Sequence, residues 1–175
     1  MYEIRIHSRG GQGGVTAARL LALSAIHDGK YATACPFYGA ERRGAPIVSF
    51  VRINDTPIKI YSQIKKPDMV VVLDAGVMDV VDVLQGLKSG GKLLVNSTHK
   101  KKFAGFSASH VDLTGIALRE NLVVAGSPIL NTPVLGALAK MGIISVDSAK
   151  KSIREMFADE RNVRAAEAAY TEMST

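Results

Sequence analysis

The chain has 175 residues, of which 47% are hydrophobic and 22% charged, as is typical of one folded domain. It carries 22 basic and 16 acidic residues, for a net charge of +6, and a single cysteine, Cys35. One thiol excludes an internal disulfide and is too few for an iron–sulfur cluster, which needs about four thiolates. No apolar run reaches the ~20 residues of a membrane span, and charges at Glu3 and Arg5 argue against a signal peptide. We therefore expect a cytoplasmic protein without a membrane partner.

The surplus of basic residues suits an anionic ligand or the acidic surface of a partner. A nucleic acid is not expected, because the sequence has no tryptophan, no basic stripe interleaved with aromatic residues and no zinc-finger or helix-turn-helix motif. The densest basic cluster, residues 100–102, is interpreted as a solvated loop. No metal site is expected, because the four histidines lack the spacing of ligands: His7, His27, His99 and His110.

The first elements follow the pattern of an open α/β fold. Residues 2–7 alternate apolar and polar side chains, which predicts a strand. A glycine-rich run follows at 8–14, and the small apolar residues of 15–27 then predict a buried helix that ends at Asp28. Strand, glycine-rich turn and helix in this order open many α/β folds.

The rest of the chain continues this alternation. A short strand is expected at 31–35, ended by Pro36, and a β-hairpin at 47–53 and 57–61 places strands at one edge of the sheet. The β-branched run 69–73 predicts a central buried strand. Further strands are expected at 92–96 and 106–111, and helices at 77–87, 114–120 (with Asp112 near its N-cap), 132–142, 146–158 and 161–172.

These elements form one domain rather than two, because the sequence has no linker, no low-complexity stretch and no internal repeat. We predict a single domain over residues 1–175, with C-terminal helices over about 132–172. Its expected fold is a three-layer α/β/α, Rossmann-like arrangement with a mostly parallel sheet and an edge hairpin.

The glycine-rich run is the strongest indication of a binding site. Between a strand and a helix, glycines let backbone N–H groups converge on an anion, and the helix N-terminus adds about half a positive charge. The dinucleotide pattern Gly-x-Gly-x-x-Gly/Ala fails at Thr16, and the Gly-Lys-Ser/Thr of a P-loop is missing after Gly13. The run therefore indicates contact with a phosphate or another ligand without naming it, and a tight packing turn is the alternative.

Two further motifs are candidates for binding. Residues 38–46 read Tyr-Gly-Ala-Glu-Arg-Arg-Gly-Ala-Pro and place Arg42 beside Arg43, so that one could bind a phosphate while the other pairs with Glu41 or a partner chain. A solvated loop with an incidental salt bridge is the other interpretation. In residues 126–133, Asn131 or Thr132 is expected to cap a helix whose first residue is Pro133, and capping alone would explain this motif.

In combination, residues 8–13, 38–46 and 131–138 resemble the gamma subunit of 2-oxoacid:ferredoxin oxidoreductases. The resemblance keeps the order and spacing of the three motifs and extends from about residue 2 to residue 172. The form Glu-Arg-Arg-Gly-Ala-Pro at 41–46 is most similar to the pyruvate and 2-oxoisovalerate members, and these two substrates stay open as alternatives.

The resemblance implies a multi-subunit enzyme of the pyruvate synthase type. Such an enzyme decarboxylates a 2-oxoacid on thiamine diphosphate, passes electrons through iron–sulfur clusters to ferredoxin and transfers the acyl group to coenzyme A. Alpha and beta subunits are implied to hold the thiamine diphosphate with its magnesium ion, and beta and delta subunits the 4Fe–4S clusters. The gamma chain is implied to bind coenzyme A and to support assembly, with no catalytic or redox group of its own, so the lone chain is expected to be inactive.

The resemblance and the glycine-rich turn together suggest a set of contacts to coenzyme A, whose phosphate groups would account for the basic surplus. Asn131 is expected to face the same cleft as the turn, because loops at the carboxyl ends of strands gather there. The candidates are the backbone of Gly11, Gln12 and Gly13, the charge of Arg9, Arg42 or Arg43 for a phosphate or a neighbouring subunit, and Asn131. The alternatives are a purely structural subunit of that complex and a free-standing Rossmann-type nucleotide-binding protein.

Overall fold

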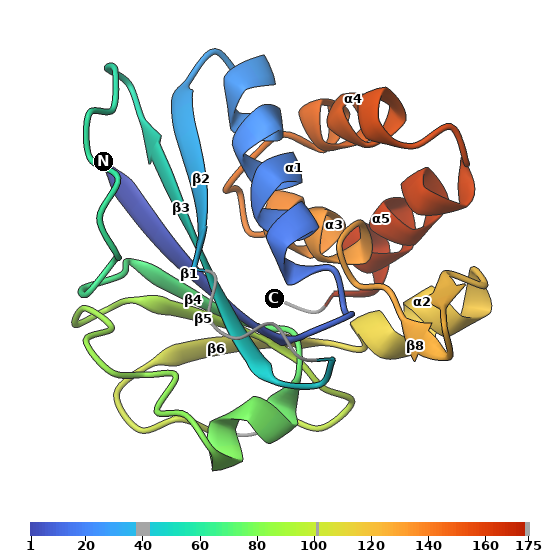
Figure 1. The fold of residues 1–175 in the computed structure, drawn as a ribbon, viewed down its shortest axis with the longest axis horizontal. Helices are drawn as coiled ribbons and strands as arrows, with labels where there is room; N and C mark the ends of the chain where they lie inside the picture. Colours follow the sequence, from blue (N-terminus) through green and yellow to red (C-terminus); the bar gives the residue numbers. More distant parts are fainter. Residues whose placement is uncertain (38–42, 101, 174–175) are drawn as a thin grey trace.

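The computed structural model describes residues 1–37, 43–100 and 102–173. Its main sheet has six strands, and helices gather against it (Figure 1). The strands are β1 (Tyr2–Arg9), β2 (Tyr31–Phe37), β3 (Pro46–Asn54), β4 (Met69–Val72), β5 (Lys92–Asn96) and β6 (Ser107–Val111), and a separate small sheet holds β7 (Val123–Val124) and β8 (Ser127–Pro128). The helices are α1 (Gly14–His27), α2 (Leu113–Arg119), α3 (Pro133–Lys140), α4 (Val146–Met156) and α5 (Arg161–Glu172), with a 3-10 helix η1 (Ala75–Asp79).

The order of strands in the main sheet is β2-β3-β1-β4-β5-β6. Strands β1, β4, β5 and β6 run parallel, whereas β3 is antiparallel to both of its neighbours, β1 and β2. The α/β class and the mostly parallel sheet predicted from the sequence are confirmed. The run at 69–73 is the buried central strand that its β-branched residues predict, with every residue of β4 fully buried.

The sequence correctly indicates a hairpin at one edge of the sheet but assigns one of its strands wrongly. Residues 57–61 form no strand, and the hairpin partner of β3 is β2. Because β3 already lies between β2 and β1, it has no free edge with which residues 57–61 could pair. The strand predicted at 31–35 also continues through Pro36, because an edge strand tolerates the missing N–H of proline.

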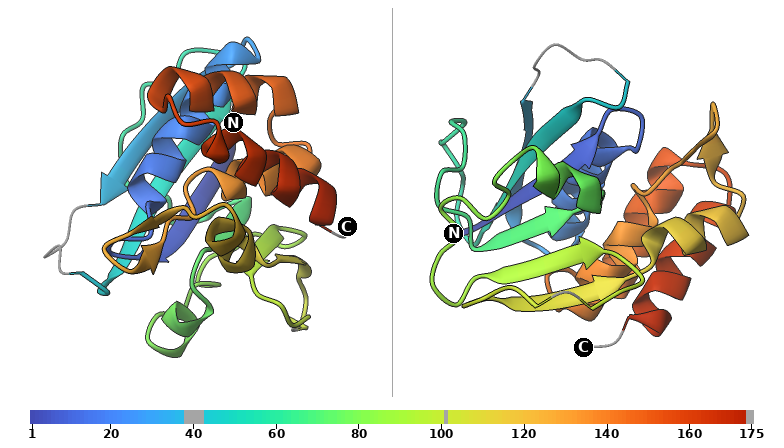
Figure 2. Two further views of the ribbon diagram at one scale, coloured as in Figure 1. Left: turned by 90° about the vertical axis from the view of Figure 1, so that its right-hand side faces the viewer. Right: turned by 90° about the horizontal axis from the view of Figure 1, so that it is seen from below.

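The two faces of the sheet are covered differently, as the two views of Figure 2 show. The larger core cluster lies between the sheet and the helices, and its fully buried members include Ile4, Ile6, Leu20, Leu21 and Leu135. The opposite face holds a smaller cluster of Val70, Val72, Val77, Val83, Leu87, Leu93 and Val95. The third layer of the fold is therefore built from η1 and the turns that follow it.

The prediction of a helix at 77–87 is wrong, because the 3-10 helix η1 ends at Asp79 and turns follow it. β-Branched valines lower the helix propensity of this segment, and Gly86 adopts a positive φ of 74°. The carboxylate of Asp82 also accepts a hydrogen bond from the N–H of Leu84 at 3.1 Å, which favours a turn over a helix. This local hydrogen bond and the backbone conformation at Gly86 favour turns over a regular helix in this segment.

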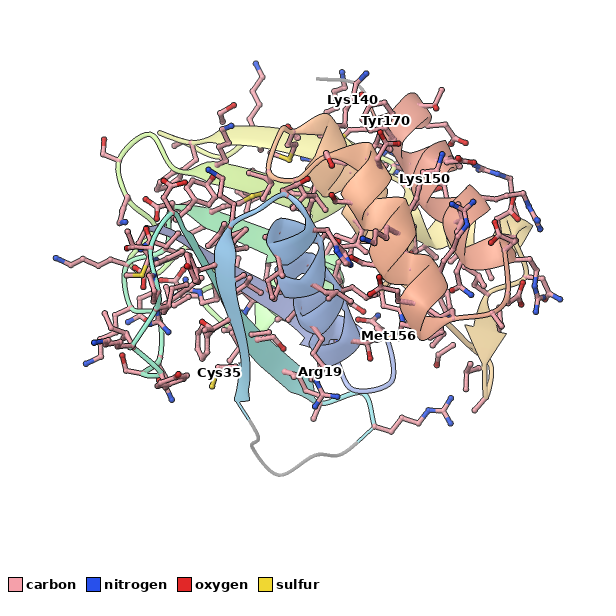
Figure 3. All side chains as sticks on the ribbon, turned by 90° about the horizontal axis from the view of Figure 1, so that it is seen from above. Arg19, Cys35, Lys140, Lys150, Met156 and Tyr170 are labelled. Atoms are coloured by element: carbon pink, nitrogen blue, oxygen red, sulfur yellow. The ribbon has the colours of Figure 1, made fainter. Side chains whose placement is uncertain are left out.

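The remaining helices are confirmed apart from their ends. The side chain of Asp112 caps α2 by accepting a hydrogen bond from the N–H of Gly115, and Thr132 is the N-cap of α3 with proline in its first turn. Figure 3 shows Lys140 beside Tyr170 where α3 meets α5, and the ammonium lies 5.1 Å from the centroid of the ring. The contact between Lys140 and Tyr170 joins α3 to α5.

Strand β1 is unusual for a central strand because one of its faces is polar. Arg5 and His7 lie opposite Val70 and Val72 of β4, so they share the η1 side of the sheet with those valines. Arg5 is only 8% exposed and His7 only 5%. Burial, together with the charge of Arg5, lowers the pKa of His7 to about 4.

The buried His7 predicts a specific dependence of stability on pH. Between about pH 6.5 and pH 4 the unfolded chain binds a proton on this histidine that the folded chain does not, so stability falls as the pH falls. We expect His7 to contribute a loss of up to about 3 kcal/mol across this window, and His7→Gln to remove that contribution. Urea unfolding at each pH measures it, with the exposed His99→Gln as the control. Equal pH slopes for wild type and His7→Gln would contradict the prediction.

Candidate functional site

The turn between β1 and α1 has a shape that only glycine fits well. Gly11 and Gly13 adopt positive φ angles of 95° and 86°. A side chain at Gly13 would place its Cβ 3.0 Å from the Cβ of Asn131, so the turn and the segment before α3 approach too closely for a larger residue. The close approach brings Asn131 to the turn, as the sequence predicts.

The N-terminus of α1 opens from this turn without a capping side chain. Its N-cap is Gly13, no side chain makes a capping hydrogen bond, and the first turn holds no acidic residue. The first N–H groups of a helix have no partner within it, and the aligned peptide dipoles add a partial positive charge there. This end of α1 therefore suits an anion.

A cleft of about 660 Å³ lies against this helix end. It is lined by Ser8, Arg9, Gly10, Gly11, Gly13, Gly14, Val15, Thr16, Arg43, Ile47, Val124, Ile129, Asn131 and Phe157. The structure thus brings five of the predicted site residues to one cleft: Arg9, Gly11, Gly13, Arg43 and Asn131. Gln12 does not line the cleft, and the predicted Arg42 lies outside the described residues.

The side chain of Gln12 holds the turn by hydrogen bonds to Arg9 and Asp74. Its Oε1 accepts a hydrogen bond from the N–H of Arg9 at 2.8 Å, and its Nε2 donates to Oδ2 of Asp74 at 2.7 Å. The other carboxylate oxygen of Asp74 accepts from the N–H of Gly76 at 2.9 Å. Asp74 therefore ties the turn to the start of η1.

Arg9 belongs to the same network. Its Nε lies 3.4 Å from Oδ1 of Asp74, and its Nη1 and Nη2 donate to the carbonyls of Gly44 and Gly76, both at 3.0 Å. Because a carboxylate balances its charge, this guanidinium positions the turn and the neighbouring segments. It adds less free positive charge to the cleft than the sequence suggests.

The backbone of the turn is also joined to two distant segments. Gly10 donates to the carbonyl of Ala45 at 2.9 Å and accepts from the N–H of Gly44 at 3.1 Å, just before β3 begins. The carbonyl of Gln12 accepts from the N–H of Leu130 at 2.9 Å. The three motifs that are separate in the sequence thus meet at one place.

Arg43 reaches across the rim of the cleft. Its Nη2 donates to the carbonyl of Ala125, on the connection between β7 and β8. It also donates to Oγ of Ser127, the first residue of β8, at 3.2 Å. Arg43 is exposed, and the two acceptors, a backbone carbonyl and a serine hydroxyl, are uncharged. Its guanidinium therefore lies at the rim of the cleft on two uncharged acceptors.

Asn131 supplies a buried polar group to the cleft. The residue is 5% exposed, and its Oδ1 has no hydrogen-bond partner among the residues that the structure describes. Leaving a buried amide oxygen unpaired costs free energy, so a donor from a bound ligand would stabilise this site. Capping does not explain Asn131, because Thr132 is the N-cap of α3.

Asp74 is the main residue that sequence reasoning missed. It follows β4, the parallel neighbour of β1, and the carboxyl ends of these two strands lie at the same edge of the sheet. An acidic residue directly after a buried parallel strand was the available signal. The apolar lining residues Ile129 and Phe157 carried no such signal, because their position depends on the packing of the C-terminal segments.

Two other kinds of site find no support in residues 1–37, 43–100 and 102–173. No group of three or more His, Cys, Asp or Glu side chains is placed to hold a metal ion there. No helix in these ranges is long and apolar enough to cross a membrane.

Replacing Asp74 tests whether its carboxylate holds the turn. Asp74→Ala removes the acceptor for Gln12 and Gly76 and the ion-pair partner of Arg9, so we expect the free energy of unfolding to fall by about 2–3 kcal/mol. Urea unfolding measures this loss, and Asp79→Ala on the exposed side of η1 should change stability by less than about 0.5 kcal/mol. Equal losses for the two variants would show that Asp74 does not have this role.

Comparison with known proteins assigns the chain to a family. Residues 3–172 match the family model described as pyruvate ferredoxin/flavodoxin oxidoreductase. Pyruvate synthase subunit PorC of Methanothermobacter marburgensis is 51% identical over 177 residues, which cover 99% of this chain and 98% of that one. The common gamma subunit of the pyruvate/ketoisovalerate oxidoreductases of Thermococcus kodakarensis is 48% identical, with coverages of 97% and 96%.

A solved structure supports the same assignment. The crystal structure of pyruvate oxidoreductase subunit PORC from Thermotoga maritima has a TM-score of 0.84 to this chain at 38% identity, and the match covers 99% of this chain and 97% of that one. The chain therefore belongs to the pyruvate ferredoxin/flavodoxin oxidoreductase family, as a subunit of the gamma type.

Proposed function

We propose that this chain is the gamma subunit of a 2-oxoacid:ferredoxin oxidoreductase, and that its cleft binds the phosphate groups of coenzyme A. The uncapped N-terminus of α1 facing the cleft is the observation that carries the proposal. The relatives are named as subunits of pyruvate synthase and of pyruvate/ketoisovalerate oxidoreductases, so the proposed substrate of the complex is a 2-oxoacid of that class.

The cleft fits the chemistry of coenzyme A, which is a polyanion joined to an uncharged arm. The N–H groups at the start of α1 and the guanidinium of Arg43 are suited to phosphate oxygens. Apolar lining residues, among them Ile129 and Phe157, suit the uncharged parts of the ligand. The volume of about 660 Å³ is within the range of about 300–1,000 Å³ that is usual for small-molecule sites.

Within the proposed complex this chain binds and orients the acyl acceptor. Asp74, Gln12 and Arg9 hold the glycine-rich turn that leads into the uncapped N-terminus of α1. Asn131 offers a buried oxygen to a donor on the ligand. The chemistry of decarboxylation and electron transfer belongs to thiamine diphosphate with magnesium and to 4Fe–4S clusters in alpha, beta and delta subunits, with ferredoxin as the acceptor. On this proposal the isolated chain is inactive.

The charge of Arg43 provides the test. In the reconstituted complex we expect Arg43→Ala to raise the KM for coenzyme A about tenfold or more, because a charge-assisted contact to phosphate is worth roughly 1.5–3 kcal/mol. The KM for the 2-oxoacid should stay unchanged, and higher salt should narrow the difference between variant and wild type. Steady-state kinetics with the two substrates varied separately give both constants. Arg42→Ala, measured in parallel, tells which of the adjacent arginines carries the effect.

The control is Arg119→Ala, which removes an exposed arginine that pairs with Glu172 away from the cleft. Gly13→Val is a poorer test, since the positive φ and the contact with Asn131 would strain the turn itself. If Arg43→Ala prevents assembly, the arginine serves an interface and the purely structural subunit is favoured. If assembly and both KM values are unchanged in the arginine variants, the phosphate site lies elsewhere.

A further inference from the structure

A second cavity lies on the opposite face of the sheet from α1. Its volume is about 410 Å³, and it lies against β1 and β3 and the segments at 63–65 and 81–85. It shares no lining residue with the cleft at the glycine-rich turn. Its polar lining includes the buried Arg5 and His7 of β1.

Both of these side chains have a buried nitrogen without a partner. Arg5 uses its Nη2 to donate to the carbonyls of Val83, at 2.9 Å, and Gln85, at 2.7 Å. Its Nε and the Nε2 of His7 are buried and have no hydrogen-bond partner among the described residues. Because the two residues are two positions apart on one strand, their side chains leave the same face about 7 Å apart.

Two other charged residues on this face of β1, Glu3 and Arg9, have ion-pair partners. Glu3 pairs with Arg52 at 2.9 Å, and Arg9 pairs with Asp74 at 3.4 Å. Within the described ranges no such ion pair is found for Arg5, although it is almost fully buried. Burial lowers the pKa of Arg5 in spite of the opposing effect of the Asp82 carboxylate, so an anion in direct contact from outside the described chain would stabilise this guanidinium.

The surroundings select the kind of anion. The desolvated imidazole of His7 is neutral at pH 7, so Arg5 is the one buried charge among the described residues that line the cavity. Lys65 and Asp82 also line the cavity, both exposed and of opposite sign. A single net positive charge with Asp82 close by favours a monoanion over a phosphate dianion.

We propose that the cavity formed around Arg5 and His7 binds a carboxylate group, which accepts hydrogen bonds from Nε of Arg5 and Nε2 of His7. The carboxylate belongs either to a small free acid or to an acidic side chain of a partner subunit. In both cases the same two donors are satisfied, and the charge of Arg5 gains an ion-pair partner in direct contact. The site is separate from the cleft proposed for coenzyme A and does not rest on that function.

The test is a titration of the purified full-length chain with acetate at pH 7, at constant ionic strength set with chloride. Nitrogen-15 labelling of the imidazoles reports on His7, and His27, His99 and His110 act as internal controls. We expect a saturable shift of the His7 resonances alone. Arg5→Lys, which keeps the charge but lacks Nε–H, should weaken acetate binding at least fivefold, and Arg5→Met should weaken it more.

Asp82→Asn is the matched variant with the opposite expected effect on acetate binding, because it removes the negative charge beside the cavity. We expect it to tighten acetate binding severalfold, and because the amide oxygen of asparagine can still accept from the N–H of Leu84, the turn that contacts Arg5 stays in place. This variant keeps the proposal testable if Arg5→Met fails to fold. Tighter binding of inorganic phosphate than of acetate, or an equal response of Asp82→Asn and wild type, would overturn the assignment to a carboxylate.

The assembled complex distinguishes the two sources. If His7 in the complex already shows its acetate-saturated resonance and added acetate changes nothing, a side chain of a partner subunit fills the cavity. If acetate still shifts the resonance, the ligand is a free acid. The proposal fails if His7 responds to acetate in neither the lone chain nor the complex and its resonance is unchanged by assembly.

Discussion

The carboxylate of Asp74 is the interaction on which the candidate site depends. A turn with two glycines at positive φ and no capping side chain has little to hold its own shape. Asp74 supplies that support from a different strand, because it binds Gln12, the N–H of Gly76 and the guanidinium of Arg9 together. The turn is consequently held in place while the first N–H groups of α1, which have no capping side chain, are left for a ligand.

The position of β1 in the sheet explains why both proposed sites involve this strand. Its carboxyl end leads into the glycine-rich turn, and the antiparallel β3 beside it begins at the same edge, so the backbone just before β3 can pair with Gly10. Its polar face carries Arg5 and His7 under η1 and the turns. A full α-helix on that face would have covered the valines more evenly, whereas the irregular chain leaves a cavity and uses two of its carbonyls for Arg5.

Local patterns were enough to predict some parts of this structure. The strand, glycine-rich turn and α1 follow from residues adjacent in sequence, and the buried β4 follows from its β-branched run. The partner of β3 could not be predicted in this way, because it depends on which strands already occupy its two edges. The role of Asp74 and the neutralised charge of Arg9 depend likewise on β4 lying beside β1. The predicted helix at 77–87 failed because two other hydrogen bonds compete with regular helical bonding: the Asp82 carboxylate accepts from the N–H of Leu84, and Arg5 donates to the carbonyl of Val83.

Pro36 has a consequence for how copies of this chain meet. In the part of the chain that the structure describes, β2 is at one end of the strand order, so one side of its backbone has no neighbouring strand. Exposed strand edges recruit the edges of other molecules into continuous sheets, which leads to aggregation. A proline within β2 removes an N–H from that strand and interrupts any ladder that a second molecule could add. A chain that must stay available for its proper partners is in this way protected at its edge against pairing with itself.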